Sequence, residues 1–311
     1  MSDALKGVIA MLGANLIWGF APLFYKVLDH IPAAEIYAHR ALWSFVFFAL
    51  ILAAQSRFHQ VFSALATGRG LAITFAAGAL ISVNWYAFIW SIQAGRATEA
   101  SLGYFIFPLV AVALGVIVFR ERFSRSQALA IALVTIALVV LTYGLGAAPW
   151  LALLLSATFG LYSLIKKQIT LGPVVSVTAE VLVVLPVAGL ILYQGFADGS
   201  AHFAQSPSVS LMLVLSGPLT ALPLILFSYA ARRVRLSTIG LLQYMNPTLQ
   251  FLCAVLVFGE PFGQWHAIAF PIIWVALAIY TLSALAQDRA SRRAMVSAAG
   301  VSTVVTKSNT D

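Results

Sequence analysis

Most Lys and Arg residues of this chain fall on one side of the membrane if its long apolar runs are interpreted as membrane helices. The runs span approximately residues 7–26, 34–54, 71–93, 99–119, 127–144, 149–166, 174–194, 209–231, 237–258 and 264–286. Each is close to the roughly 20 residues that cross about 30 Å of hydrocarbon, and none alternates with the period of two of a barrel strand. The sequence predicts an all-α polytopic membrane protein with ten transmembrane helices.

Of the 18 Lys and Arg residues, 15 would lie on one side of the membrane and three on the other. By the positive-inside rule, the crowded side is cytoplasmic and so are both termini. The net charge of +8 then follows from topology, so a nucleic-acid partner is not needed to explain it. The crowded side holds Lys6, Arg57, Arg69, Arg120, Arg122, Arg125, Lys166, Lys167, Arg232, Arg233, Arg235, Arg289, Arg292, Arg293 and Lys307, and the other side holds Lys26, Arg40 and Arg96.

The whole chain is 61% hydrophobic and only 9% charged, but after about residue 287 its composition shifts to Ser, Ala, Thr, Arg and Lys. Such a segment cannot bury enough apolar surface to order itself, so residues 288–311 are predicted to form a flexible basic cytoplasmic tail. An interfacial helix is the alternative. Cys253 is the single cysteine, so an intramolecular disulfide is ruled out, and it lies inside an apolar run.

An internal repeat relates the two halves of the chain. At an offset of 139, residues 96–130 match residues 235–269 at ten of 35 positions, including Pro108 with Pro247 and Glu121 with Glu260. The first helices align at an offset of 141, which places Gly19 on Gly160. Five helices per half is an odd number, so the second copy enters the membrane from the opposite side, as in secondary transporters. We expect inverted repeats over residues 1–145 and 146–287.

Helix-interrupting residues recur at intramembrane depth. A proline there frees a backbone carbonyl and bends the helix, which membrane proteins tolerate where protein or a water-filled cavity receives that carbonyl. A plain structural bend is the alternative for each residue alone. The glutamates Glu121 and Glu260 are expected to cap or lock helix ends. The candidates for gating or helix bending are Gly19, Pro22, Pro108, Pro218 and Pro247.

Several segments resemble one known family. They are Leu16-Ile17-Trp18-Gly19, Glu35-Ile36-Tyr37-Ala38-His39-Arg40, Glu99-Ala100-Ser101-Leu102-Gly103-Tyr104-Phe105, Leu236-Ser237-Thr238, Leu242-Gln243-Tyr244, Pro247-Thr248-Leu249-Gln250-Phe251 and Phe258-Gly259-Glu260-Pro261-Phe262. They look like the RarD branch of the EamA-type drug/metabolite transporters, the chloramphenicol-sensitive protein group, over roughly residues 5–288. The resemblance implies ten helices in two inverted repeats, a bacterial inner membrane and movement of small metabolites or drugs, most often outward.

Polar and aromatic side chains at intramembrane depth are candidates for a solute site, because aromatic walls with a few fixed polar groups are typical of small-molecule pockets. Core packing or an interfacial belt is the alternative for each aromatic residue alone. Depth in the membrane and the family resemblance together favour Trp18, Asn84, Trp85, Tyr104, Gln243 and Tyr244 most. The candidate substrate-binding residues are Asn15, Trp18, Asn84, Trp85, Tyr104, Tyr162, Gln243 and Tyr244.

Ionisable residues inside the membrane are costly, at about 2.5 to 3.5 kcal/mol at the helix centre, and therefore point to function. Glu35, His39 and Arg40 lie in one predicted helix, and Glu180 occupies the repeat position equivalent to His39. One hypothesis is a proton or charge relay through His39 and Glu180, since His titrates near neutral pH, with Glu35 and Arg40 as further coupling candidates. The alternative is a structural ion-pair cluster of Glu35, His39 and Arg40 that snorkels at the outer helix end.

The sequence predicts a secondary transporter that works by alternating access, and the resemblance implies export of small metabolites, such as amino acids, aromatic or amphiphilic compounds, or of drugs. Its expected partners are a small-molecule substrate, membrane lipids and protons, with no cofactor and no metal. An enzyme is disfavoured because the sequence lacks a His-Glu-x-x-His motif, a Gly-x-Ser-x-Gly elbow and a phosphate-binding loop. A small-solute channel or a non-transporting scaffold are the remaining alternatives.

Overall fold

A computed structural model of the chain describes residues 3–119, 124–146, 148–167, 169, 171–234 and 236–308, and over these residues it contains helices and no strand. Glu121, Arg120, Arg122 and Arg235, on which sequence predictions were made, lie outside the described residues. The helices are α1 (Asp3–Val27), α2 (Ala33–Ala54), α3 (His59–Leu65), α4 (Gly68–Gln93), α5 (Ala97–Phe119), α6 (Arg125–Leu145), α7 (Trp150–Lys167), α8 (Pro173–Ala197), α9 (Pro207–Ala231), α10 (Leu236–Gln243), α11 (Met245–Leu252), the π-helix η1 (Cys253–Val257) and α12 (Gln264–Ser308).

Eight of these helices are long and apolar enough to cross a membrane, namely α1, α2, α4, α5, α6, α8, α9 and α12. They account for eight of the ten predicted spans. The other two predicted spans correspond to shorter apolar helices, Trp150–Lys166 and Leu241–Val257.

The ninth predicted span is divided at Tyr244, between α10 and α11. Pro247 explains the break, because proline has no N–H for the carbonyl four residues earlier, here that of Gln243, and its ring clashes with that carbonyl. The side chain of Asn15 in α1 donates to the neighbouring free carbonyl of Leu242, at 2.9 Å. The helix is therefore interrupted close to Pro247, whereas α5 continues without a break through Pro108.

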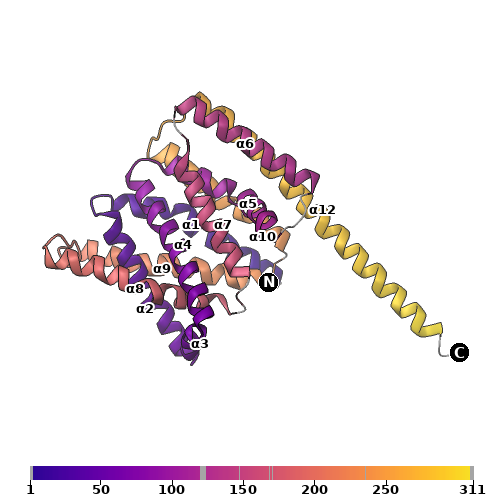
Figure 1. Cartoon of the computed structure of the whole chain (residues 1–311), viewed down its shortest axis with the longest axis horizontal. Coiled ribbons are helices and arrows are strands. Elements are labelled where there is room, and N and C mark those ends of the chain that lie inside the picture. Colours follow the sequence, from indigo (N-terminus) through magenta and orange to yellow (C-terminus); the bar gives the residue numbers. More distant parts are fainter. Residues whose placement is uncertain are drawn as a thin grey trace.

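The helices pack in a defined set of pairs (Figure 1). Helix α1 packs on α9 and α11, α2 on α8 and α9, α4 on α7 and α8, and α5 on α7 and α11. Helix α6 lies beside the first half of α12 along one edge of the bundle. The largest buried apolar cluster joins α1, α2, α4, α5, α7 and α9, so the core lies where both halves of the sequence meet.

Helix α12 continues to Ser308 and projects away from the bundle toward the C-terminus (Figure 1). Residues 288–308, predicted as a flexible tail, are therefore helical here. The Ala, Arg and Met residues within positions 289–299 favour helix propagation, whereas residues 300–308 are rich in Val, Ser and Thr, which favour it less. The packed first part of α12 supplies the nucleus that an isolated segment would lack.

Two glutamates close one end of the bundle by accepting hydrogen bonds from free backbone N–H groups at helix N-termini. Glu260 accepts from the N–H groups of Ala97 and Thr98 at the start of α5, at 2.6 and 2.7 Å. Glu99 accepts from the N–H of Leu151 in α7, at 2.8 Å, and also pairs with Arg96. The expected helix-end role of Glu260 is thus confirmed.

We expect Glu260→Ala to lower the free energy of unfolding by about 1–2 kcal/mol, because two N–H groups lose their acceptor. Thermal unfolding in detergent measures the loss. The control is Asp29→Ala, which removes a half-exposed ion pair with Lys26 (3.1 Å) and should change stability by less than about 0.5 kcal/mol. Equal losses in the two variants would contradict the capping role.

Candidate functional site

Asn84 of α4 joins three helices at the centre of the bundle. Its side chain is 1% exposed and its amide nitrogen donates to the carbonyl of Leu155 (2.9 Å) and the hydroxyl of Thr158 (3.0 Å), both in α7. Its amide oxygen accepts from the hydroxyl of Tyr104 in α5, at 2.9 Å. The structure therefore brings two predicted substrate-binding residues, Asn84 and Tyr104, into direct contact.

An aromatic wall continues from Tyr104 in two directions. Its ring meets Phe88 of α4 edge to face, at a centroid distance of 5.7 Å, and Phe88 meets Tyr25 of α1 at 6.1 Å. On its other side Tyr104 meets Phe159 at 6.1 Å, and Phe159 stacks on Tyr162 at 6.0 Å. Tyr104 and Tyr162 thus belong to one continuous wall.

Arg40 of α2 lies in this aromatic region. It is 7% exposed, and its guanidinium carbon lies 4.3 Å from the ring centroid of Trp85 and 5.7 Å from that of Tyr25. Seven residues separate it from the start of α2, which places it about 10 Å into the helix. The Tyr25 hydroxyl lies beside the guanidinium and near Thr220 of α9.

No carboxylate neutralises Arg40 within the described ranges, where no Asp or Glu oxygen lies within 4 Å of its nitrogens. Its Nε atom is buried and lacks a hydrogen-bond partner there as well. A desolvated cation–π contact contributes about 2 kcal/mol, whereas burying an ion costs several kcal/mol. The two rings offset only part of that cost, so Arg40 is a buried cation with unused binding capacity.

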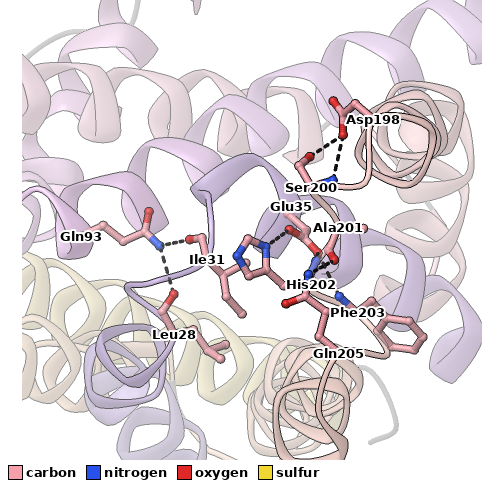
Figure 2. Close-up of polar contacts among 10 residues, drawn as sticks. All are labelled: Leu28, Ile31, Glu35, Gln93, Asp198, Ser200, Ala201, His202, Phe203 and Gln205. Atoms are coloured by element: carbon pink, nitrogen blue, oxygen red, sulfur yellow. Dashed lines mark hydrogen bonds and ion pairs between the residues drawn. The ribbon is translucent and has the colours of Figure 1, made fainter.

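Glu35, five residues before Arg40, is engaged by the loop that joins α8 to α9 (Figure 2). Its carboxylate accepts from the backbone N–H groups of His202 (2.7 Å) and Phe203 (3.3 Å) and contacts Nδ1 of His202 at 2.9 Å. The same loop is tightened by Asp198, whose pKa is lowered by hydrogen bonds from the hydroxyl and N–H of Ser200. Glu35 therefore clamps this loop over the start of α2.

A second contact holds the loop between α1 and α2 near this clamp (Figure 2). The side-chain amide of Gln93, at the end of α4, donates to the carbonyls of Ile31 (2.7 Å) and Leu28 (3.3 Å). Sequence reasoning missed both Gln93 and His202, because their partners lie 62 and 167 residues away in the chain.

The predicted cluster of Glu35, His39 and Arg40 does not form as an ion-pair network in the described residues. Glu35 contacts His202, whereas the His39 ring stacks on Phe203 at a centroid distance of 4.8 Å. Both ring nitrogens of His39 are buried without a hydrogen-bond partner there. Arg40 does not snorkel, because almost its whole side chain is buried.

Glu180 of α8 is buried in a separate polar cluster. Its carboxylate pairs with Nζ of Lys166 (2.7 Å) and accepts hydrogen bonds from the hydroxyls of Ser176 (2.7 Å) and Tyr162 (3.0 Å). Among the described residues, no hydrogen bond or ion pair connects Glu180 with His39. A relay between these two groups is therefore not assembled in this conformation.

Trp18 and its neighbours show how α1 accommodates its proline. Pro22 cannot donate to the carbonyl of Trp18, and the side chain of Gln250 in α11 donates to that carbonyl instead, at 3.4 Å. The backbone of Gly19 is approached by α11 so closely that an added Cβ would lie 2.7 Å from Cβ of Leu249. The tryptophan ring faces Phe227 of α9, at 6.2 Å.

The remaining predicted residues lie apart from the aromatic wall. Tyr244 packs against the second buried cluster, which joins α5, α6, α7 and α12. Gln243 and Pro218 are half-buried, at the end of α10 and inside α9 respectively.

One cavity of the described structure lies near the end of the bundle that Glu99 and Glu260 close. It has a volume of about 230 Å³, and its lining includes Arg96, Glu99, Leu141, Pro149, His266 and Phe270. None of the predicted substrate-binding residues lines it. Another, smaller cavity, of about 120 Å³, lies beside Glu35 and the end of α8.

Comparisons with known proteins agree with this architecture. The model of the EamA-like transporter family matches residues 5–143. Protein RarD of Streptomyces exfoliatus is 42% identical over 299 residues, which cover 96% of this chain and 95% of that protein. The uncharacterized transporter YojE of Bacillus subtilis (strain 168) is 38% identical over 295 residues, covering 94% and 98%. A protein of known crystal structure shares the fold, with a TM-score of 0.58, 17% identity and coverage of 89% of this chain and 97% of that one.

Asn84→Ala should lower the free energy of unfolding by about 1–2 kcal/mol, because the buried hydroxyl of Tyr104 loses its acceptor and the carbonyl of Leu155 loses one of its donors. Unfolding in mixed detergent micelles measures the change. Asn246→Ala, which removes one contact with Gln250 (2.9 Å), is the control and should cost less than half as much. A smaller loss in Asn84→Ala than in the control would contradict the three-helix role.

In Glu35→Ala we expect faster hydrogen exchange of the His202 and Phe203 amides, since both N–H groups lose their acceptor. Mass spectrometry of the peptide that contains residues 201–205 reads the change. Asp198→Ala is the control, and it should speed hydrogen exchange of the Ser200 amide without changing that of the His202 and Phe203 amides. Unchanged exchange in Glu35→Ala would show that another contact holds the loop.

Proposed function

Because the chain belongs to the EamA-like transporter family, in its RarD-like branch, we propose that it is a secondary transporter of the bacterial inner membrane that exports small metabolites or drugs by alternating access. The observation that carries this proposal is the polar and aromatic centre around Asn84, Tyr104 and Arg40, which lies where both halves of the sequence meet. Aromatic walls with few fixed polar groups suit an amphiphilic solute.

The pattern of helix packing supports two inverted repeats. In this relation α1 corresponds to α7, α2 to α8, α4 to α9, α5 to α10–η1 and α6 to α12. The contact of α1 with α9 then has its counterpart in the contact of α7 with α4, and that of α2 with α9 in the contact of α8 with α4. Likewise α1 on α11 repeats as α7 on α5. The pairs α2–α8, α5–α11 and α6–α12 each relate an element to its own copy. A two-fold relation between the halves gives this set of pairs.

Close helix contacts at glycines that occupy equivalent positions in the two halves also support the two-fold relation. Gly19 approaches Leu249, and its copy 141 positions later, Gly160, approaches Val110, which is the copy of Leu249 at an offset of 139. An added Cβ would lie 2.7 Å from Leu249 in the first case and 3.5 Å from Val110 in the second. Small residues allow such close helix approach in membranes.

A second pair of glycines lies on α4 and α9. A Cβ on Gly78 would lie 2.8 Å from the carbonyl oxygen of Glu180 in α8, and one on Gly217 would lie 2.6 Å from that of Trp43 in α2. The two glycines are 139 positions apart. These contacts lie between the halves, so they mark surfaces that would slide or rock during alternating access.

The proposed transporter has ten spans, with the shorter α7 and the α10–η1 segment crossing as well, and both termini cytoplasmic. In single-cysteine variants of a Cys253→Ala background, we expect Ser208→Cys to react with a membrane-impermeant maleimide in spheroplasts. The matched Ser63→Cys should react only after lysis, since α3 would then be cytoplasmic. The opposite pattern would invert the topology, and labelling of both residues in spheroplasts would contradict the span assignment.

Transport itself is tested with proteoliposomes loaded with a mixture of amino acids and aromatic metabolites, with and without an inward proton gradient. Mass spectrometry of the external medium should detect selective, saturable release. Dependence on the gradient would assign proton coupling, for which His39 and Glu180 are the proposed groups. Release of no solute, or of every solute at channel-like rates, would contradict the carrier.

A further inference from the structure

We propose that Arg40 is the residue that recognises the substrate and that it does so by binding a carboxylate group. The substrate class is then an organic acid or amino acid with an apolar or aromatic body. This inference rests on the proposed transport function and narrows it, because a neutral solute would leave the buried guanidinium without a counter-ion.

The glutamate carboxylates of the described residues already have partners. Glu180 pairs with Lys166, and Glu99 pairs with Arg96. The carboxylate of Glu35 is occupied by the loop after α8, and that of Glu260 by the start of α5. Among the described residues, no carboxylate is left for Arg40.

The surroundings of Arg40 provide contacts for the rest of such a ligand. The Trp85 and Tyr25 rings contact the cation but supply only one oxygen, the Tyr25 hydroxyl, so guanidinium N–H donors remain for a planar, two-oxygen acceptor. The wall that runs through Phe88 and Tyr104 starts at Tyr25 and suits an aromatic or aliphatic body.

The position of Arg40 also fits a transport site. Its helix, α2, packs on α8 and α9, so the guanidinium lies beside the boundary between the two halves. Thr220 of α9 lies near Tyr25, which places groups from both halves around one cation. Substrate sites of transporters with inverted repeats lie at such boundaries.

The test uses purified full-length protein in detergent, with tryptophan fluorescence as the readout because Trp85 contacts Arg40. The probes are 3-phenylpropanoate, its primary amide and inorganic phosphate. We expect 3-phenylpropanoate to bind at least about 30-fold more tightly than the amide, and Arg40→Gln to weaken its binding by a similar factor. Equal binding of acid and amide, or unchanged binding in Arg40→Gln, would overturn the proposal. Tighter binding of phosphate than of the acid would also overturn it in favour of a phosphate site.

A stability measurement separates recognition from a structural role. Arg40→Gln should melt at the same temperature as the wild type or higher, because it removes a buried charge that the protein leaves without a counter-ion. Arg96→Gln is the matched control, since Arg96 also stacks on a tryptophan, Trp150 (4.9 Å), but has its carboxylate partner, and it should melt lower. A lower melting temperature in Arg40→Gln than in Arg96→Gln would assign Arg40 a structural role.

The proteoliposome assay distinguishes this inference from the proposed function. If neutral solutes are released selectively and Arg40→Gln releases them at the wild-type rate, the carboxylate proposal fails while the carrier stands. If no solute is released, the carrier itself fails. Selective release of carboxylates that is lost in Arg40→Gln would support both.

Discussion

Every polar group that this chain buries must find its partner within the protein, because hydrocarbon offers none. The structure meets this constraint with long-range contacts between helices. Asn84 bonds a carbonyl and a hydroxyl of α7, and Gln250 bonds the carbonyl that Pro22 frees in α1. Glu260 bonds the free N–H groups at the start of α5. These contacts fix the relative positions of helices that apolar side chains alone would leave free to slide.

Arg40 departs from this pattern. Its Nε atom, like the ring nitrogens of His39, has no hydrogen-bond partner in the described structure, and its guanidinium also lacks a carboxylate counter-ion there. Arginine side chains stay charged in proteins. In the described structure, aromatic rings rather than a carboxylate lie against the Arg40 guanidinium. A protein that needs only stability would gain by replacing such a cation with an apolar residue. Retaining it is reasonable when a ligand supplies the missing negative charge for part of a transport cycle.

Much of the architecture could be predicted from local sequence. Apolar run lengths located the eight long helices, and Pro247 marked the break between α10 and α11. Glu260 matches Glu121 in the internal repeat and was expected to cap a helix end. It accepts a hydrogen bond from the N–H of Ala97 at the start of α5. Residues 288–308 are helical, whereas the sequence favoured a flexible tail and kept an interfacial helix as the alternative, because composition indicates how little a segment can bury but not whether a helix propagates into it from a packed one.

The candidate site was less predictable, because the roles of its residues depend on partners far away in sequence. Asn15 was a candidate for binding solute, yet its side chain donates a hydrogen bond to the carbonyl of Leu242, 227 residues later. Arg40 was expected either in a relay or in a snorkelling cluster with Glu35. Its isolation could not be foreseen, because it depends on His202 engaging Glu35 from a loop 167 residues away.

The most direct test of the central claim is an experimental structure of the protein with a transported organic acid bound. We predict that the carboxylate lies within 4 Å of the Arg40 guanidinium, with the apolar body of the ligand against Tyr25, Trp85 or Tyr104. A ligand found instead in the cavity lined by Arg96 and His266, with Arg40 unchanged, would contradict the account.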